Sequence, residues 1–171
     1  MDIQLIIGDI TEQPDCEAIV NTANPMLMRG AGVAGAIHKR AGSALEEFCE
    51  PHAPIKTTEV FVSPAFKLPN KYVLHALGPK YYQDPNPMEL LKRTYTNILN
   101  ACTTNKIRTI AIPAISTGSY GFPLEQATLI AVETLLNWND KYPEMVRLVA
   151  FDKPAYQVAS DILKSKTVES Q

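Results

Sequence analysis

Short apolar runs alternate along this chain with longer segments in which apolar residues recur at helical spacing. Runs rich in Ile and Val are typical of buried strands, and they predict strands at residues 3–7, 17–21, 59–63, 72–76, 109–112 and 147–151. Helical spacing predicts helices over residues 33–50 and 88–103, from Pro123 onward, and over 154–163. The polar ending, residues 164–171, is expected to form a flexible tail.

Alternating strands and helices predict an α/β fold with a mostly parallel sheet and helices on both of its faces. The 171 residues suit a single domain, with a core over about residues 3–163, and no repeat or low-complexity block marks a boundary. In such sheets ligands bind beyond the carboxyl ends of the strands. We therefore expect one crevice to be formed by the loops that follow the strands ending near Ile7, Val20, Ile112 and Phe151.

The composition of the chain argues against several classes of function. Hydrophobic residues make up 46% of the chain and charged residues 20%, and the formal net charge is −2, so no broad basic field is present to hold a nucleic-acid backbone. Cys16, Cys49 and Cys102 are widely spaced and form no CxxC pair, which indicates reduced thiols rather than a disulfide or metal site. The N-terminus lacks a charged leader segment, and no stretch reaches membrane-spanning length. We expect a cytoplasmic, monomeric protein without metal or membrane partners.

The most distinctive segment covers residues 21–42 and reads NTANPMLMRGAGVAGAIHKRAG. Its glycine-rich loop, residues 30–32, leads directly into the helix expected to begin near Val33. Small residues allow close approach of a ligand, and the free N–H groups at a helix start attract an anion such as a phosphate or diphosphate. The amides of Asn21 and Asn24 stand just upstream, where we expect them to hold a sugar hydroxyl or a water molecule.

Two other interpretations of this glycine loop fit less well. Residues 30–35 match G-x-G-x-x-G, the pattern of dinucleotide-binding loops. Such a loop begins immediately after its strand, and the strand after its helix ends in an acidic residue. Neither feature is present in this sequence. A purely structural turn is disfavoured by a second polar, glycine-containing loop at residues 116–121, which also lies between a buried strand and a helix. Two such loops suit a two-sided clamp for a diphosphate.

Taken together, these segments resemble the macrodomain family, the ADP-ribose-binding fold, over about residues 3–163. The resemblance implies a three-layer α/β/α sandwich around a mixed central sheet, with ADP-ribose as ligand and no cofactor. The matching pieces stand in the family's order and spacing: GDIT at 8–11, IVNTAN at 19–24, GAGVAGAIHKRAG at 30–42, HALGP at 75–79, PAISTGSYGFP at 113–123 and VAFD at 149–152.

The resemblance also implies a role for individual residues. Asp9 would accept a hydrogen bond from the adenine amino group, beside the Ile10 amide, and Phe151 would stack on or edge the ring. Asn24 would bind the distal ribose and orient a water near its anomeric carbon, and Tyr120 would pack against that ribose. The remaining expected ligand contacts, mostly backbone amides around the diphosphate, are Ala23, Gly30, Ala31, Gly32, Val33, Ser116, Thr117, Gly118, Ser119 and Tyr120.

Two departures from the family pattern bear on activity. Ala34 stands where the best-known hydrolase branch has an Asp that helps to activate water, although the GVAGAI context resembles macrodomains regarded as hydrolases without it. Ala31 replaces a glycine common in relatives, so its φ must be negative. His38 and His75 are interpreted as structural residues rather than bases.

The leading hypothesis is therefore an enzyme that binds terminal ADP-ribose and hydrolyses a bond at its distal ribose. The candidate substrates are mono-ADP-ribosylated acidic side chains of proteins, ADP-ribose 1″-phosphate and O-acetyl-ADP-ribose. A catalytically silent reader of ADP-ribose is the alternative, which Ala34 favours. Binding of RNA is a third possibility, which the acidic charge balance disfavours.

Overall fold

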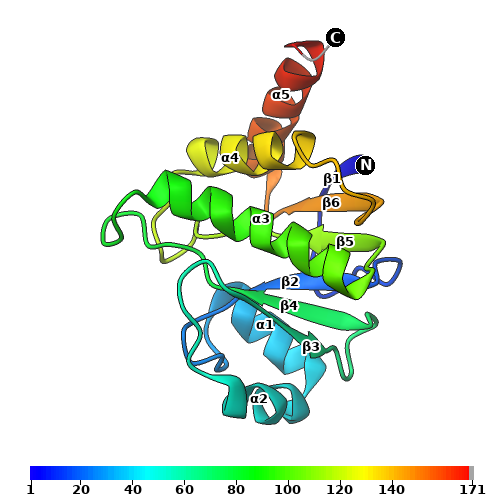
Figure 1. Cartoon of the computed structure of the whole chain (residues 1–171), viewed down its shortest axis with the longest axis vertical. Helices are drawn as coiled ribbons and strands as arrows, with labels where there is room; N and C mark the ends of the chain where they lie inside the picture. The colour runs from blue at the N-terminus through cyan, green and yellow to red at the C-terminus, as the bar shows by residue number, and fades with distance from the viewer. Residues whose placement is uncertain (170–171) are drawn as a thin grey trace.

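Six strands form one sheet between two layers of helices in the computed structural model, which describes residues 1–169 (Figure 1). The strands follow the spatial order β1-β6-β5-β2-β4-β3, and all neighbours are parallel except β3 and β4, which are antiparallel. The expected mixed sheet is therefore confirmed. The strands are β1 (Asp2–Ile7), β2 (Ala18–Thr22), β3 (Val60–Pro64), β4 (Tyr72–Ala76), β5 (Thr109–Ile112) and β6 (Met145–Ala150).

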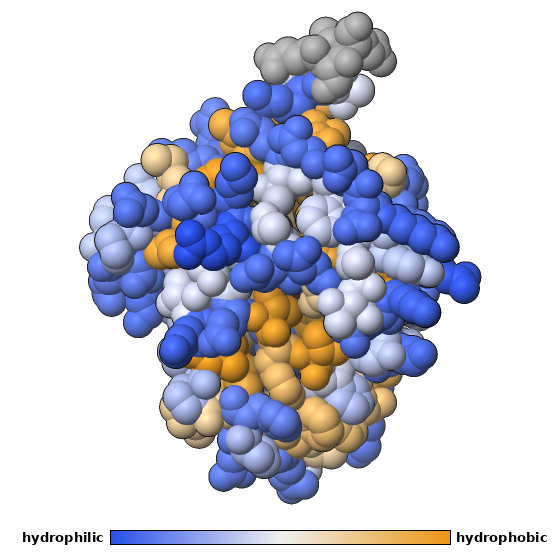
Figure 2. Space-filling view, viewed as in Figure 1, coloured by the Kyte–Doolittle hydropathy of each residue, from blue (hydrophilic) through white to orange (hydrophobic). Residues whose placement is uncertain are grey.

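The helices divide unequally between the two faces of the sheet. One face carries α1 (Gly32–Ala41) and α2 (Ser43–Cys49), followed by the short 3₁₀ helix η1 (Glu50–His52). The other carries α3 (Pro87–Asn105), α4 (Leu124–Leu136) and α5 (Lys153–Glu169). This is the three-layer α/β/α sandwich that the family resemblance implies, and it has the helices on both faces that the sequence pattern predicts. Seen from the α3 side, apolar side chains gather on the surface below α3, and most of the remaining face is hydrophilic (Figure 2).

Strand periodicity divides the core into two halves. In β2, Ala18 and Val20 pack toward α3 and α4, whereas Ile19 between them packs toward α1 and α2, and all three are fully buried. Alternation of this kind is what a strand covered on both faces produces. Each fully buried aliphatic side chain contributes about 1.5–3 kcal/mol relative to an exposed one. Since the two faces of the central strands are occupied, the ends of these strands are the open part of the sheet.

Two helix boundaries differ from the prediction. The single helix expected over residues 33–50 is two helices, because Gly42, with φ 92° and ψ 170°, leaves the helical conformation after its N–H has made the last bond of α1 to the His38 carbonyl. Helix α5 continues past Leu163 to Glu169, so residues 164–169 are helical, and the end of the expected tail, residues 170–171, lies outside the described residues. Among residues 1–169, no helix is both long and apolar enough to cross a membrane.

Candidate functional site

The sheet topology places the distinctive loops at one end of the molecule. Strands β1, β6, β5 and β2 are consecutive neighbours and run parallel, so the loops that follow them leave the sheet on the same side. The register aligns Ile7 with Ala150 and Ile112 with Leu148, which keeps the strand ends close to level. The four loops expected to act together therefore lie side by side.

The ends of β1 and β6 present a carboxylate and an aromatic ring. The Gly8 N–H donates to the Ala150 carbonyl at 3.2 Å, so Asp9 and Phe151 follow backbone segments that are bonded to each other. Phe151 is 90% exposed, although a strand-end Phe in an ordinary core would be buried. A ring exposed to this extent beside a carboxylate is a suitable surface for a flat heterocycle that carries an amino group.

Asp9 is held in an ionised, orientated state. Its Oδ1 accepts hydrogen bonds from the Thr11 amide at 2.8 Å and from the Thr11 hydroxyl at 2.7 Å, and these bonds lower the pKa of the carboxyl. One carboxylate oxygen is thus engaged by Thr11, and the exposed side chain can offer the other to a donor. Ile10, by contrast, has its side chain in the core, so only its backbone amide can serve a ligand.

The start of α1 is an open donor site. Its N-cap residue, Ala31, has φ −95° and provides no side-chain cap, and no acidic residue lies in the first turn. The negative φ that the sequence requires of Ala31 is confirmed, and the left-handed position, φ +58°, is filled by Gly32. The N–H groups of a first helical turn have no partner within the helix and carry the positive end of its dipole. This end of α1, with Val33 in its first turn, can bind an anion.

The loop at residues 116–122 offers a second set of donors. It is closed by hydrogen bonds from the Phe122 amide to the Ser116 carbonyl at 2.9 Å and from the Gly121 amide to the Gly118 carbonyl at 3.0 Å. Ser116 is buried, with φ 67°. Within the part of the chain that the structure describes, no hydrogen bond uses the amides of four successive loop residues: Thr117, Gly118, Ser119 and Tyr120.

Asn24 lies beside the α1 loop, with its amide held by the backbone. Its Nδ2 donates to the Met28 carbonyl at 2.7 Å, and its Oδ1 accepts from the Met28 amide at 3.0 Å. Both bonds fix the orientation of the amide and leave one N–H and one lone pair for a ligand. A Cβ built on Gly30 would stand 3.6 Å from Asn24 Nδ2 and 3.7 Å from the Cβ of Ala34. Asn24, Gly30 and Ala34 are therefore immediate neighbours, preceded by the buried Ala23.

Asn21, expected to reach a ligand, lies in the core instead, so that prediction is wrong. It is 1% exposed, and its Nδ2 lies 3.1 Å from His75 Nδ1. The Nε2 of His75 is 2.9 Å from the Ser63 hydroxyl, and burial lowers the pKa of His75 to about 3. His38 is also buried in this region, 6.3 Å from His75 between ring centres. Both histidines thus occupy structural positions, as expected.

Tyr120 has a neighbour that the sequence pattern did not indicate. Lys80 Nζ lies 5.4 Å from the centre of the Tyr120 ring, and the Tyr81 amide donates to the Tyr120 carbonyl at 2.9 Å. Partial burial raises the pKa of the Tyr120 phenol, so it is protonated at neutral pH. The segment that holds Lys80 follows β4. Because β4 is parallel to β2, this segment leaves the sheet at the same end as the other site loops, and that position was the signal in the sequence that could have pointed to Lys80.

Comparisons with known proteins agree on one family. The family model described as "Macro domain" matches residues 20–131. A protein of Salmonella newport named O-acetyl-ADP-ribose deacetylase is 41% identical, over 94% of this chain and 93% of the relative. The Oceanobacillus iheyensis macrodomain solved with ADP superposes with a TM-score of 0.92 at 34% identity, covering 98% of this chain and 92% of that one. The Trypanosoma brucei macrodomain in complex with ADP-ribose superposes with a TM-score of 0.86 at 33% identity, covering 93% of this chain and 68% of that one.

Proposed function

Because this chain belongs to the Macro domain family, we propose that it binds ADP-ribose at the carboxyl ends of β1, β6, β5 and β2 and hydrolyses a bond at the distal ribose. One observation carries the proposal. Two donor sites, the start of α1 and the amides of residues 117–120, belong to neighbouring loops at one end of the sheet. Backbone donors on two sides hold a diphosphate without any basic side chain, which suits a chain of net charge −2.

The rest of the ligand fits on either side of this cradle. The adenine would lie on Phe151, with its amino group donating to Asp9, since these two residues follow adjacent strands. The distal ribose would lie toward Asn24, which is next to the α1 loop, and Tyr120 would pack against it. The proposed ligand therefore extends from the β1 and β6 ends to the β2 end of the site.

The proposed chemistry relies on positioning rather than on a side-chain base. Ala34 provides no carboxylate beside the α1 loop, so we infer that the water is orientated by the Asn24 amide and by a phosphate oxygen of the substrate. With O-acetyl-ADP-ribose, the water oxygen bonds to the acetyl carbon, the ester bond to the ribose oxygen breaks, and that oxygen takes a proton. Acetate and ADP-ribose are released. Orientation and preorganised donors are large sources of rate enhancement.

The proposed substrates are O-acetyl-ADP-ribose, ADP-ribose 1″-phosphate and mono-ADP-ribosylated acidic side chains, acted on by a cytoplasmic monomer. The name of the Salmonella relative supports the first of these. A silent reader of ADP-ribose is the second candidate function, and the observation that favours it is Ala34, a small apolar residue at the position of an expected base. The donors described above serve either function, so turnover is what separates them.

The test compares turnover with affinity in an Asn24→Ala variant. If Asn24 orients the water, turnover of O-acetyl-ADP-ribose falls by about two to three orders of magnitude, equivalent to about 3–4 kcal/mol of transition-state stabilisation. The dissociation constant for ADP-ribose, measured by calorimetry, changes far less, because the cradle and the adenine contacts remain. Equal losses of turnover and affinity would contradict the assigned role.

A matched control is available in α3. Asn97 also donates one side-chain hydrogen bond to a backbone carbonyl, that of Thr58, at 2.8 Å, and it belongs to none of the four loops. Asn97→Ala should lower stability without lowering turnover. A loss of turnover in this control would show that removal of any such bond, and not of the Asn24 amide in particular, impairs the enzyme.

A further inference from the structure

The loop at residues 8–17 joins β1 to β2 and packs on the α1 and α2 side of the sheet, where Ile10 and Cys16 belong to the same buried cluster as Val149 of β6. Arg147 lies in β6 beneath this loop, between Met145 and Val149 on the same face, and it is only 9% exposed. A guanidinium at this depth loses hydration, so it must be compensated by hydrogen bonds.

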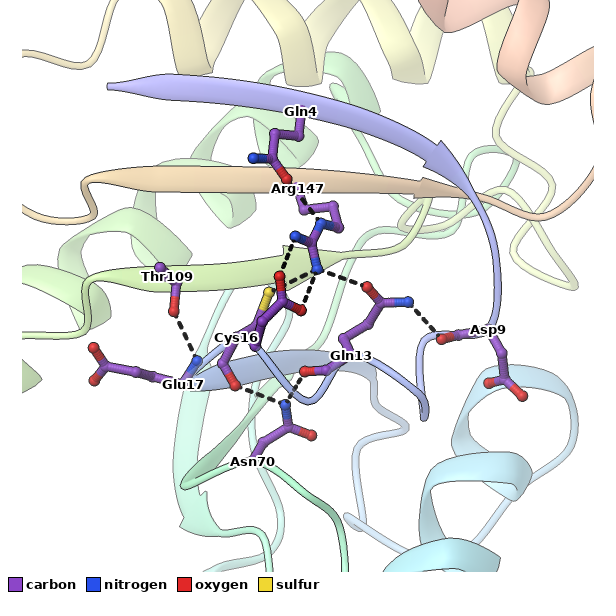
Figure 3. Close-up of polar contacts among 9 residues, drawn as sticks. Gln4, Asp9, Gln13, Cys16, Glu17, Asn70, Thr109 and Arg147 are labelled. Carbon is purple, nitrogen blue, oxygen red and sulfur yellow. Dashed lines mark hydrogen bonds and ion pairs between the residues drawn. The ribbon is translucent and has the colours of Figure 1, made fainter.

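The guanidinium is compensated almost entirely by the loop (Figure 3). Nη1 donates to Asp15 Oδ1 at 2.7 Å and to Gln13 Oε1 at 2.9 Å, and Nη2 donates to Asp15 Oδ2. Nε donates to Gln4 Oε1 in β1 at 3.0 Å. This charged hydrogen bonding lowers the pKa of Asp15 and raises that of Arg147. Arg147 thereby fastens the loop to the middle of β6.

Gln13 links Arg147 to the backbone of Asp9 through hydrogen bonds at both ends of its amide. Gln13 is 4% exposed, and its Nε2 donates to the Asp9 carbonyl at 2.8 Å. Because Arg147 only donates and a carbonyl only accepts, the Gln13 amide has a single orientation that satisfies both partners. Figure 3 shows the Asp9 carboxylate on the far side of its backbone from Gln13. The Asp9 carbonyl is thus held by the Gln13 side chain and by the Glu12 amide, which donates to it at 3.0 Å, and the Asp9 carboxylate is held by Thr11.

We propose that Gln13, held by Arg147, is a positioning residue that aims the Asp9 carboxylate at the adenine amino group and so sets selectivity for adenine. The inference rests on the proposed function, which assigns the adenine to Asp9 and Phe151. Arg147 and Phe151 belong to one chain segment, so the same network fixes the carboxylate relative to the ring surface. The Asp15 side chain is 63% exposed, so its ion pair with Arg147 adds little to stability, which is consistent with a role in geometry.

Gln13→Glu removes the hydrogen bond that holds the Asp9 backbone. The new carboxylate still accepts from Arg147, now with opposite charge, but it has no N–H for the Asp9 carbonyl and repels that oxygen instead. The melting temperature should fall because of this lost bond, and the preference for ADP-ribose over its inosine analogue, measured by calorimetry, should fall about tenfold. A wild-type preference in Gln13→Glu overturns the proposal.

Asn70→Asp is the matched control, because it makes the same chemical change against the same loop. Asn70 Nδ2 donates to the carbonyls of Gln13 and Cys16, each at 2.8 Å, and makes no bond to Asp9. This variant should melt at a lower temperature while keeping the wild-type preference. If it loses the preference as fully as Gln13→Glu does, general loosening of the loop is the cause and the proposal fails.

A second variant, Arg147→Lys, tests the proposal if Gln13→Glu does not fold. Arg147→Lys keeps the charge for Asp15 but lacks the planar fork that reaches both Asp15 and Gln13, so the preference should again fall. If Gln13→Glu does not fold and Arg147→Lys keeps the wild-type preference for ADP-ribose over its inosine analogue, the inference is wrong. Wild-type protein that binds neither ADP-ribose nor its inosine analogue would contradict the proposed function instead, which keeps the two failures distinct.

Discussion

Gly35 is the position at which the smallest substitution should disturb the α1 loop most. A Cβ at residue 35 would stand 2.5 Å from the Gly30 carbonyl oxygen and 3.5 Å from the carbonyl carbon. Ordinary Cβ contacts begin at 3.4 Å, so in Gly35→Ala one of the two groups must move by about 0.9 Å. The obstructing atom is backbone, so no side-chain rotation relieves the contact. The Gly30 loop itself has to shift.

The size of the effect follows from two opposing contributions. Overpacking of this kind costs about 1–3 kcal/mol, and the higher helix propensity of Ala offsets about 1 kcal/mol of that cost. We expect the free energy of unfolding to fall by up to about 2 kcal/mol, which lowers the melting temperature by up to about 8 °C in a chain of this size. Because the loop next to Asn24 moves, affinity for ADP-ribose should fall by about tenfold or more.

Calorimetric unfolding and ligand titration measure both effects. Gly118→Ala is the stability control, because no heavy atom beyond its chain neighbours lies within 4 Å of the point that a Cβ would occupy there, and its φ is not in the left-handed region. Its melting temperature should differ from the wild type by no more than the usual effect of a surface change. A Gly35→Ala protein with wild-type melting temperature and affinity would refute the argument from the Gly30 contact.

Three further predictions concern charge and the adenine surface. Ala34→Asp should weaken ADP-ribose binding, measured by calorimetry, because it puts an uncompensated negative charge in the first turn of α1 beside the diphosphate; tighter binding would contradict this. Phe151→Ala should lower affinity for ADP-ribose by about tenfold with an unchanged melting temperature, since the ring is 90% exposed and supports no core. Burial lowers the pKa of His75 to about 3 and also lowers that of His38. The free energy of unfolding should therefore decrease as pH falls from about 6.5, and His75 alone accounts for up to about 1.4 kcal/mol per pH unit. Stability that does not change between pH 7 and pH 5 in denaturant titrations would contradict this.

Local patterns were sufficient to predict the elements and the loops of the site. The strand runs, the helix start near Gly32 and the negative φ of Ala31 are consequences of neighbouring residues, and the structure confirms them. The inward direction of Asn21 was not predictable in this way, because it depends on which face of β2 the residue occupies. Gly42 ends α1 through a left-handed φ that a glycine permits but does not require.

Contacts between distant parts of the chain lay beyond the reach of the sequence pattern. Arg147 and Gln13 are 134 residues apart, and nothing in the apolar run MVRLVA indicates which loop its arginine meets. The Asn24 amide was correctly placed beside the glycine loop, but its bonds to the Met28 backbone depend on the path of the intervening turn. Tertiary hydrogen bonds of this kind decide how the site is held.

The measurement that tests the central claim most directly is wild-type turnover of an ester-linked substrate, O-acetyl-ADP-ribose, beside calorimetric binding of ADP-ribose to the same preparation. The proposed hydrolase releases acetate well above the rate without enzyme and binds ADP-ribose at micromolar strength, about −8 kcal/mol, with AMP far weaker because the cradle holds the diphosphate. Tight binding of ADP-ribose with a rate of acetate release equal to that without enzyme would contradict hydrolysis and leave the reader as the function of this chain.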